Sequence, residues 1–248
     1  MSSTTWTPAA VASEGRRWQG RLWRAVEAQH RASTLRLVDT LAEQAQLESL
    51  LEASKPALPA QAAAHHYLLL TPFRYPSPHP GGSRFRGVTD PGVFYGADEP
   101  RTACAELGYW RWRFLLDSPA LERLGSLPHT LFQAAAAGTA LDLTQPPFAR
   151  DTPAWTAPHD YSACQHLAGV ARTGRIALLR YRSVRDPAAG MCAAVLTPVA
   201  LGPEPLLEQT WRLTVTRQRI QWQRDSVLHT ESFEFSAAAR HDTLGPVT

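Results

Sequence analysis

Residues 81–114 read GGSRFRGVTDPGVFYGADEPRTACAELGYWRWRF, and the rest of the chain is organised around them. A glycine-rich loop with two arginines leads into a short apolar strand, Gly92–Tyr95. Asp98 is expected to cap a following helix that has Pro100 in its first turn. The buried stripe of this helix is expected to consist of Ala103, Leu107, Trp110 and Phe114.

Three residues of this stretch, Arg84, Tyr95 and Glu106, are spaced eleven residues apart. An arginine binds two phosphate oxygens at once, and nearby glycines let backbone N–H groups approach an anion. A tyrosine stacks on flat rings, and a carboxylate beside an apolar stripe is partly desolvated. These residues predict a nucleotide site next to a carboxylate, although a solvated arginine, a core aromatic and an ion-paired glutamate are the structural alternatives.

The composition describes a globular protein with a diffuse charge. Of 248 residues 44% are hydrophobic, eight are tryptophan, and the net charge is +3. Such weak basicity does not predict nucleic-acid binding. The three cysteines have no metal-ligand spacing, so we expect reduced thiols and no bound metal. Because a signal pattern and an apolar run of ~18 residues are both missing, we expect a cytoplasmic protein without membrane association.

Ser183 follows a predicted strand, between Arg182 and Arg185. The G-x-S-x-G elbow is absent, so Ser183 is not expected to be a nucleophile. Its expected role is a hydrogen bond that orients a sugar or an amide. The sequence also lacks the G-x-G-x-x-G and P-loop motifs, and we assign no cofactor.

The chain is expected to divide at a proline-rich linker into residues 1–58 and a catalytic domain, 59–248. The first segment is predicted to have a disordered start, 1–13, and two helices between Glu14 and Ala53 that break near Arg31. These helices are expected to pack on the catalytic domain or to form a dimer or partner surface.

Strands with inserted helices and no regular βαβ repeat predict an α+β fold with a mixed or antiparallel sheet. A helix is expected from Asp160 to a stop at Gly174, after a long loop over 145–160. The further predicted strands are His66–Leu70, Thr130–Ala135, Thr139–Leu143, Ile176–Tyr181, Cys192–Leu196, Trp211–Thr216, Ile220–Gln223 and Ser232–Phe235, the last three as an antiparallel meander.

Five pieces of the sequence together resemble the RES domain family. They are Gly82-Ser83-Arg84-Phe85, Gly92-Val93-Phe94-Tyr95, Ala103-Cys104-Ala105-Glu106, the segment from Asp160-Tyr161 to His166-Leu167-Ala168, and Tyr181-Arg182-Ser183-Val184-Arg185. The resemblance covers roughly residues 65–235. The loop departs from the family pattern Gly-Gly-Arg-Trp-Asn, since it reads Gly-Ser-Arg-Phe-Arg here.

The resemblance implies an ADP-ribosyltransferase-like fold with flanking helices. It also implies a toxin that degrades NAD⁺, with phosphate or water as the acceptor, and that an Xre-type helix-turn-helix antitoxin neutralises. NAD⁺ is then a substrate and not a cofactor. The positions carried over are Arg84, Glu106 and Ser183 as catalytic residues and Arg74, Tyr75 and Tyr95 as substrate-binding residues.

The implied roles follow from the chemistry of the nicotinamide–ribose bond. Glu106 stabilises the positive charge that develops on the ribose. Arg84, with Arg74 as a helper, binds the diphosphate, Tyr95 packs against nicotinamide or ribose, and Ser183 holds the nicotinamide end. Arg86 is the weaker candidate of the two loop arginines.

Two other functions remain open from the sequence. A protein ADP-ribosyltransferase would use the same residues and differ only in its acceptor. A non-catalytic binding module would use the predicted helices at 14–53 as its surface. The sequence also leaves open whether the protein is a homo-oligomer.

Overall fold

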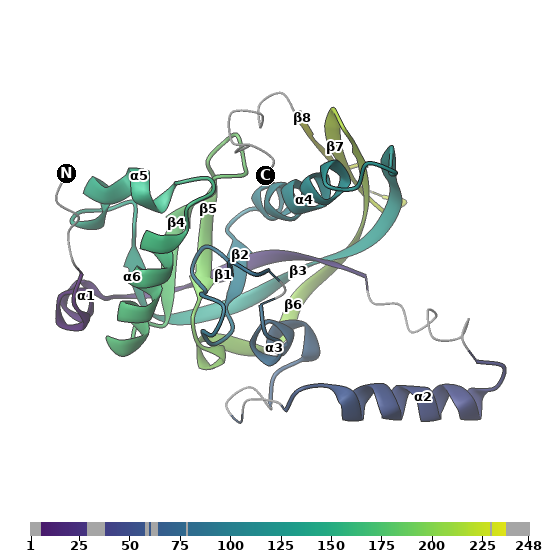
Figure 1. Cartoon of the computed structure of the whole chain (residues 1–248), viewed down its shortest axis with the longest axis horizontal. Helices are drawn as coiled ribbons and strands as arrows, with labels where there is room; N and C mark the ends of the chain where they lie inside the picture. The colour runs from purple at the N-terminus through teal and green to yellow at the C-terminus, as the bar shows by residue number, and fades with distance from the viewer. Residues whose placement is uncertain are drawn as a thin grey trace.

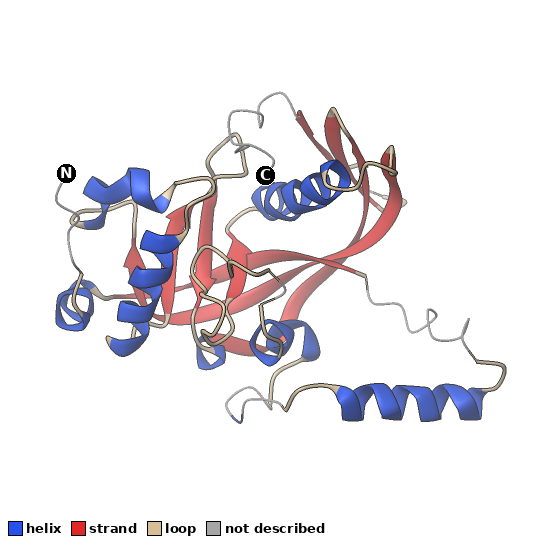
Figure 2. Cartoon of the chain, viewed as in Figure 1, coloured by secondary structure: helices blue, strands red, loops and turns tan. Residues whose placement is uncertain are grey.

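The computed structural model describes residues 6–28, 38–57, 60, 64–77, 79–228 and 230–236. Within them, helices surround an eight-stranded mixed sheet of order β1-β2-β5-β4-β3-β6-β7-β8 (Figures 1 and 2). The expected α+β class is confirmed. The strands are β1 Arg16–Glu27, β2 Phe94–Ala97, β3 Arg123–Asp142, β4 Leu178–Arg182, β5 Met191–Val195, β6 Leu201–Thr216, β7 Arg219–Arg224 and β8 Ser232–Ser236. The helices are α1 Pro8–Glu14, α2 Leu41–Ser54, α3 Tyr67–Arg74, α4 Pro100–Leu116, α5 Thr152–Trp155 and α6 Ser162–Thr173, with short 3₁₀ turns at Phe148–Asp151 and Pro198–Ala200.

The long strand β3 connects the two halves of the sheet. It pairs in parallel with β4 and antiparallel with β1 and β6. Strand β1 also pairs with β2 at Trp23 and Ala97. Strands β1, β2, β5, β4 and β3 are therefore linked in a closed circuit of pairings, and β6, β7 and β8 continue from β3 as the expected antiparallel meander.

The N-terminal segment differs most from the sequence prediction. Residues 16–27, expected to be helical, form β1 and pair with β3 along their whole length. The expected disordered start contains α1, whose Val11 is fully buried. Of the stretch expected to be helical, Leu41–Ser54 does form a helix, α2, and the expected break near Arg31 and the boundary after residue 58 lie outside the described residues. The segment before residue 58 thus contributes a strand to the main sheet.

Four further expectations are corrected. His66–Leu70 is not a strand, because His66 is the N-cap of helix α3 and Tyr67–Leu70 form its start; the two strands expected within 130–143 are parts of the continuous strand β3, which ends at Asp142. Glu99 takes the N-cap position of α4, while Asp98 pairs with Arg180. Residues 145–160 contain α5 and a 3₁₀ turn instead of a plain loop.

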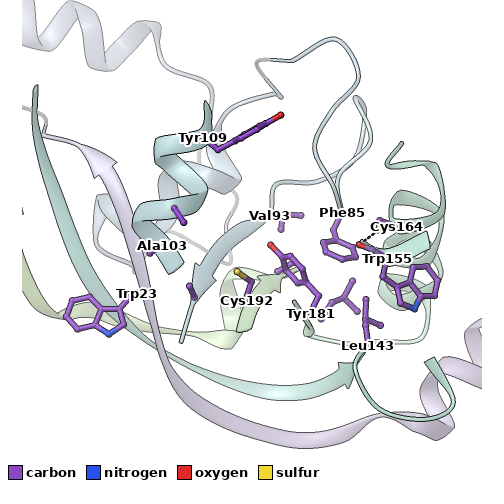
Figure 3. Close-up of a cluster of buried hydrophobic side chains, with 14 of the residues drawn as sticks. Trp23, Phe85, Val93, Ala103, Tyr109, Leu143, Trp155, Cys164, Tyr181 and Cys192 are labelled. Atoms are coloured by element: carbon purple, nitrogen blue, oxygen red, sulfur yellow. Dashed lines mark hydrogen bonds between the residues drawn. The ribbon is translucent and has the colours of Figure 1, made fainter. Parts of the chain in front are cut away.

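Helices cover both faces of the sheet around two hydrophobic clusters. Alternate residues of β4 point to opposite faces, so Leu178 packs with α3 while Leu179 and Tyr181 pack with α4 and α6. Figure 3 shows Tyr181 beside Cys192 on this second side, with Phe85 reaching toward it from the loop before β2. Among the described residues, none of the helices is both long and apolar enough to span a bilayer.

Helix α4 is rotated relative to the sequence prediction. Gly108 faces Ile220 and Trp222 of β7, and Trp112 donates a hydrogen bond of 3.1 Å to the Arg217 carbonyl in the turn between β6 and β7. A Cβ atom on Gly108 would lie 2.8 Å from a side-chain carbon of Ile220, so the absence of a side chain lets the helix approach the sheet closely. In contrast, Trp110 and Phe114 of the predicted buried stripe are 38% and 51% exposed.

Candidate active site

A cavity of about 200 Å³ lies between helix α4, strands β1 and β2, and the loops before β2 and after β4. Arg84, Tyr95 and Glu106 all line it, which places three of the predicted site residues together. The predicted buried stripe of α4 contributes Ala103, Leu107 and Trp110 to the same wall. The stripe therefore lines the cavity, while Ala103 and Leu107 also pack against the hydrophobic core.

Glu106 is held by Ser183. The Ser183 Oγ atom donates a hydrogen bond of 2.5 Å to Glu106 Oε1 and accepts bonds from the backbone N–H groups of Arg185 and Asp186. A hydroxyl has one proton to donate, and here the carboxylate receives it. Ser183 is also buried, so its position favours orienting Glu106 over the expected contact with a nicotinamide or sugar.

A second contact docks the turn after β4 onto α4. Asp186 accepts hydrogen bonds from Arg101 and, at 2.8 Å, from Thr102 Oγ1, both in the first turn of the helix. The neighbouring Gly190 fits closely there, since a Cβ atom would lie 2.1 Å from the Thr102 hydroxyl. The turn and the helix are joined at two points, which fixes Ser183 against Glu106.

Arg84 extends from the glycine-rich loop into the cavity wall. Its Nη1 atom donates to the carbonyl oxygens of Trp155 and Ala157, each at 2.9 Å, and its guanidinium lies 4.8 Å from the centre of the Tyr161 ring. The side chain is buried and forms no ion pair with any carboxylate in the described part of the chain. A buried cation without an anion is costly, and this arrangement suits an anionic ligand.

Tyr95 fixes the loop that carries Arg84. Its hydroxyl is 2.8 Å from Ser83 Oγ and accepts a 2.9 Å bond from the backbone N–H of Phe85. Burial raises the pKa of Tyr95 to about 12, so the phenol stays neutral at physiological pH. The ring lines the cavity as predicted, but the hydroxyl is committed to the loop and not to a ligand.

The loop is also shaped by its own backbone and by α6. Gly82 has φ +75°, a conformation that disfavours residues with a side chain, and a Cβ atom there would lie 2.1 Å from the carbonyl oxygen of Arg86. Gln165 of α6 donates its amide to the carbonyl oxygens of Gly81 and Ser83 at 2.9 and 3.0 Å. These contacts fix the path of the loop on both sides of Arg84.

Arg74 and Tyr75, predicted to bind substrate, do not line the cavity. Arg74 Nε donates to the carbonyl oxygen of Pro56 at 2.7 Å, at the end of α3. The Tyr75 carbonyl accepts a 2.8 Å bond from Arg86, which also contacts the Asp90 carbonyl. Arg86 therefore supports the loop, and Arg74, Tyr75 and Arg86 are not among the residues that line this cavity.

Several cavity residues were not predicted from the sequence. Trp23 and Arg24 come from β1, which was expected to be helical, and burial lowers the pKa of Arg24 to about 10. Tyr161 and Arg185 belong to segments that carried the family resemblance but had no assigned role. A second, more open hollow of about 430 Å³ shares Trp110 and Tyr161 with the cavity.

Comparisons with known proteins identify a family and a similar solved structure. The family model described as "RES domain" matches residues 58–216, more than half of the chain. None of the curated proteins matches. Among solved structures, a chain in the crystal structure of the M. tuberculosis MbcT–MbcA toxin–antitoxin complex is similar at 13% identity, with a TM-score of 0.46 and 95% coverage of each chain. On the family match, this chain belongs to the RES domain family.

Proposed function

We propose that this protein degrades NAD⁺ by breaking the bond between nicotinamide and ribose. The observation that carries the proposal is the Glu106 carboxylate, held by Ser183 in a cavity whose other charged side chains are arginines. A carboxylate serves a reaction that develops positive charge, and guanidinium groups suit the diphosphate of the substrate. Membership of the RES domain family supports the same reaction.

The chemistry at Glu106 follows from the charge of the leaving group. When the C–N bond breaks, its electron pair moves to the pyridinium nitrogen, and nicotinamide leaves as a neutral molecule. The ribose carbon becomes oxocarbenium-like, and a nearby carboxylate stabilises this cation. A phosphate or water oxygen then bonds to that carbon, which yields ADP-ribose 1″-phosphate or ADP-ribose; water also releases a proton. The role of Ser183 is to hold Glu106 in one orientation while the charge develops.

The walls of the site suit a dinucleotide. Arg84 would contact the diphosphate through the donors that the carbonyls of Trp155 and Ala157 leave free. Trp110 is partly exposed and lines both the cavity and the second hollow, and its ring already stacks with that of His79, with the ring centres 5.3 Å apart, so a base could stack there beside or in place of the His79 ring. The two hollows together give room for a longer ligand than the first cavity alone could hold.

Incubation of the purified chain with NAD⁺, with and without inorganic phosphate, tests the proposal. Release of free nicotinamide is the expected result, and a phosphorylated sugar product that requires phosphate identifies the acceptor. Transfer of ADP-ribose to a protein would instead identify a protein ADP-ribosyltransferase. Unchanged NAD⁺ under all conditions would contradict the proposed activity and leave a binding module.

We further propose that the protein is the toxin of a toxin–antitoxin pair and acts on the cytoplasmic NAD⁺ pool. Membership of the family supports this role, with an Xre-type helix-turn-helix protein as the antitoxin. Expression in bacteria should lower cellular NAD⁺ before growth stops, and the Glu106→Gln variant should do neither. Growth arrest with normal NAD⁺ would refute this toxin mechanism.

A further inference from the structure

Arg185 is a buried cation of the cavity to which the sequence assigned no function. It follows Ser183 by two residues, and its backbone N–H donates to the Ser183 hydroxyl that also holds Glu106. Its side chain is 5% exposed and lines the same cavity as Glu106 and Arg84. The Ser183 hydroxyl thus holds both the Glu106 carboxylate and the backbone N–H of Arg185.

The guanidinium of Arg185 is clamped in one orientation. Nη2 donates to the Pro158 carbonyl at 2.5 Å and to the Tyr161 hydroxyl at 3.1 Å. The Cζ atom lies 3.8 Å from the centre of the Tyr109 ring, which packs against the flat cation. Nη1 is buried and has no hydrogen-bond partner among the described residues. The side chain is therefore rigid, and part of its donor capacity is unused.

A comparison with Arg180, another buried arginine, shows how the arginines of the cavity differ in their partners. Arg180 is as buried as Arg84 and Arg185 but lies outside the cavity, and it pairs with the Asp98 carboxylate through two hydrogen bonds. Arg84 and Arg185 line the cavity, and neither forms an ion pair within the described residues. Asp186, the acid next to Arg185 in sequence, is bound to Arg101 and Thr102.

The charged residues of the cavity also indicate that a ligand anion binds there. Arg24, Arg84 and Arg185 line it, and Glu106 is the one acidic side chain among its described lining residues. Leaving a buried charge unpaired costs free energy unless a ligand supplies the opposite charge. A phosphate group does so and matches the donors of a guanidinium. The contrast with Arg180 indicates that the missing partners are ligand anions and not protein carboxylates.

We propose that Arg185 is a phosphate-binding residue of the site, acting with Arg84 in the cavity that Glu106 also lines. The inference deepens the proposed function, since the phosphate group belongs to the dinucleotide or to the inorganic phosphate that accepts the ribose. Both sources present the same oxygens to the guanidinium, and binding measurements separate them.

The test measures anion affinity without turnover. Inorganic phosphate, pyrophosphate and ADP-ribose are titrated separately against the full chain, with thermal shift as the readout. Arg185→Gln should weaken binding of at least one anion about 10- to 100-fold, the size of one lost charge-assisted hydrogen bond. Arg182→Gln is the matched control, since it removes an exposed arginine three residues away and should leave all three affinities unchanged.

The pattern of losses identifies the source of the phosphate. Weaker binding of inorganic phosphate alone assigns Arg185 to the acceptor, and weaker binding of pyrophosphate and ADP-ribose assigns it to the dinucleotide. Wild-type affinity for all three in folded Arg185→Gln would overturn the proposal. Should that variant not fold, Arg185→Lys decides: the ammonium lacks the forked donors, so several-fold weaker binding is expected and unchanged binding refutes the role. The readout is anion binding and not NAD⁺ cleavage, so phosphate binding by Arg185 and the proposed NAD⁺-degrading activity can each fail without the other.

Discussion

Substitution of Glu106 by glutamine tests the proposed chemistry most directly. The change keeps the length of the side chain and removes its negative charge. The glutamine carbonyl oxygen still accepts the Ser183 hydrogen bond, so the contact between α4 and the turn after β4 remains. Asp186 continues to hold the same turn through Arg101 and Thr102, and we expect little change in stability.

The expected loss of rate follows from the transition-state charge. Removal of one preorganised electrostatic contact to a developing charge costs about 2.7–4 kcal/mol. At about 1.36 kcal/mol per factor of ten, this corresponds to a rate roughly 100- to 1000-fold lower. Because the neutral amide does not stabilise an oxocarbenium-like ribose, the loss should appear in kcat and not only in KM.

Nicotinamide release at saturating NAD⁺, followed by chromatography, measures this effect. Glu99→Gln is the matched control: it makes the same chemical change at an exposed position of the same helix, where the side chain forms no cap hydrogen bond. The control should retain the wild-type rate. A folded Glu106→Gln protein that consumes NAD⁺ at the wild-type rate would refute the role of the carboxylate.

Three further predictions concern the loop and the rim of the site. Gly82→Ala should destabilise the protein by about 1–2 kcal/mol or more, because φ is +75° there and the new Cβ would meet the Arg86 carbonyl; chemical denaturation measures this, and an unchanged midpoint contradicts it. Tyr95 has a pKa raised from 10.0 to about 12 in the fold, so its contribution to stability is complete below pH 10 and is lost as the pH rises through about 12. Tyr95→Phe should reduce this alkaline loss in pH-dependent denaturation, and an identical alkaline profile would show that Tyr95 does not cause it. Trp110→Ala should raise the KM for NAD⁺ about 5- to 100-fold through loss of base stacking, whereas an unchanged KM would remove Trp110 from the binding surface.

The local patterns predicted the elements whose stabilising contacts are near in sequence. Helix α6 begins after Asp160, which accepts the backbone N–H of Ser162, and ends at Gly174 as expected. The antiparallel meander was likewise predicted, because alternating apolar residues separated by turns define antiparallel strands, although β6 begins at Leu201, ten residues before the predicted start at Trp211.

The elements that were predicted wrongly depend on distant partners. Residues 16–27 have apolar side chains at helical spacing, yet pairing with β3 along twelve residues makes them a strand. His66–Leu70 is an apolar run too short to distinguish a strand from a helix, and packing on the sheet decided for α3. Trp110 shows the same limit on α4, since apolar spacing does not separate a core face from a cavity wall.

The sequence by itself determined which candidate site residues are present and their order along the chain: a loop arginine, a strand tyrosine, a helix glutamate and a serine after a later strand. The same residues carried the family resemblance. Tertiary structure alone decided how these groups are used. Ser183 and Glu106 are 77 residues apart, and only their approach to 2.5 Å commits the serine proton to the carboxylate. Likewise, the burial of Arg185 among Tyr109, Pro158 and Tyr161, with no carboxylate partner in the described part of the chain, is set by packing between distant segments, which spacing along the chain does not reveal.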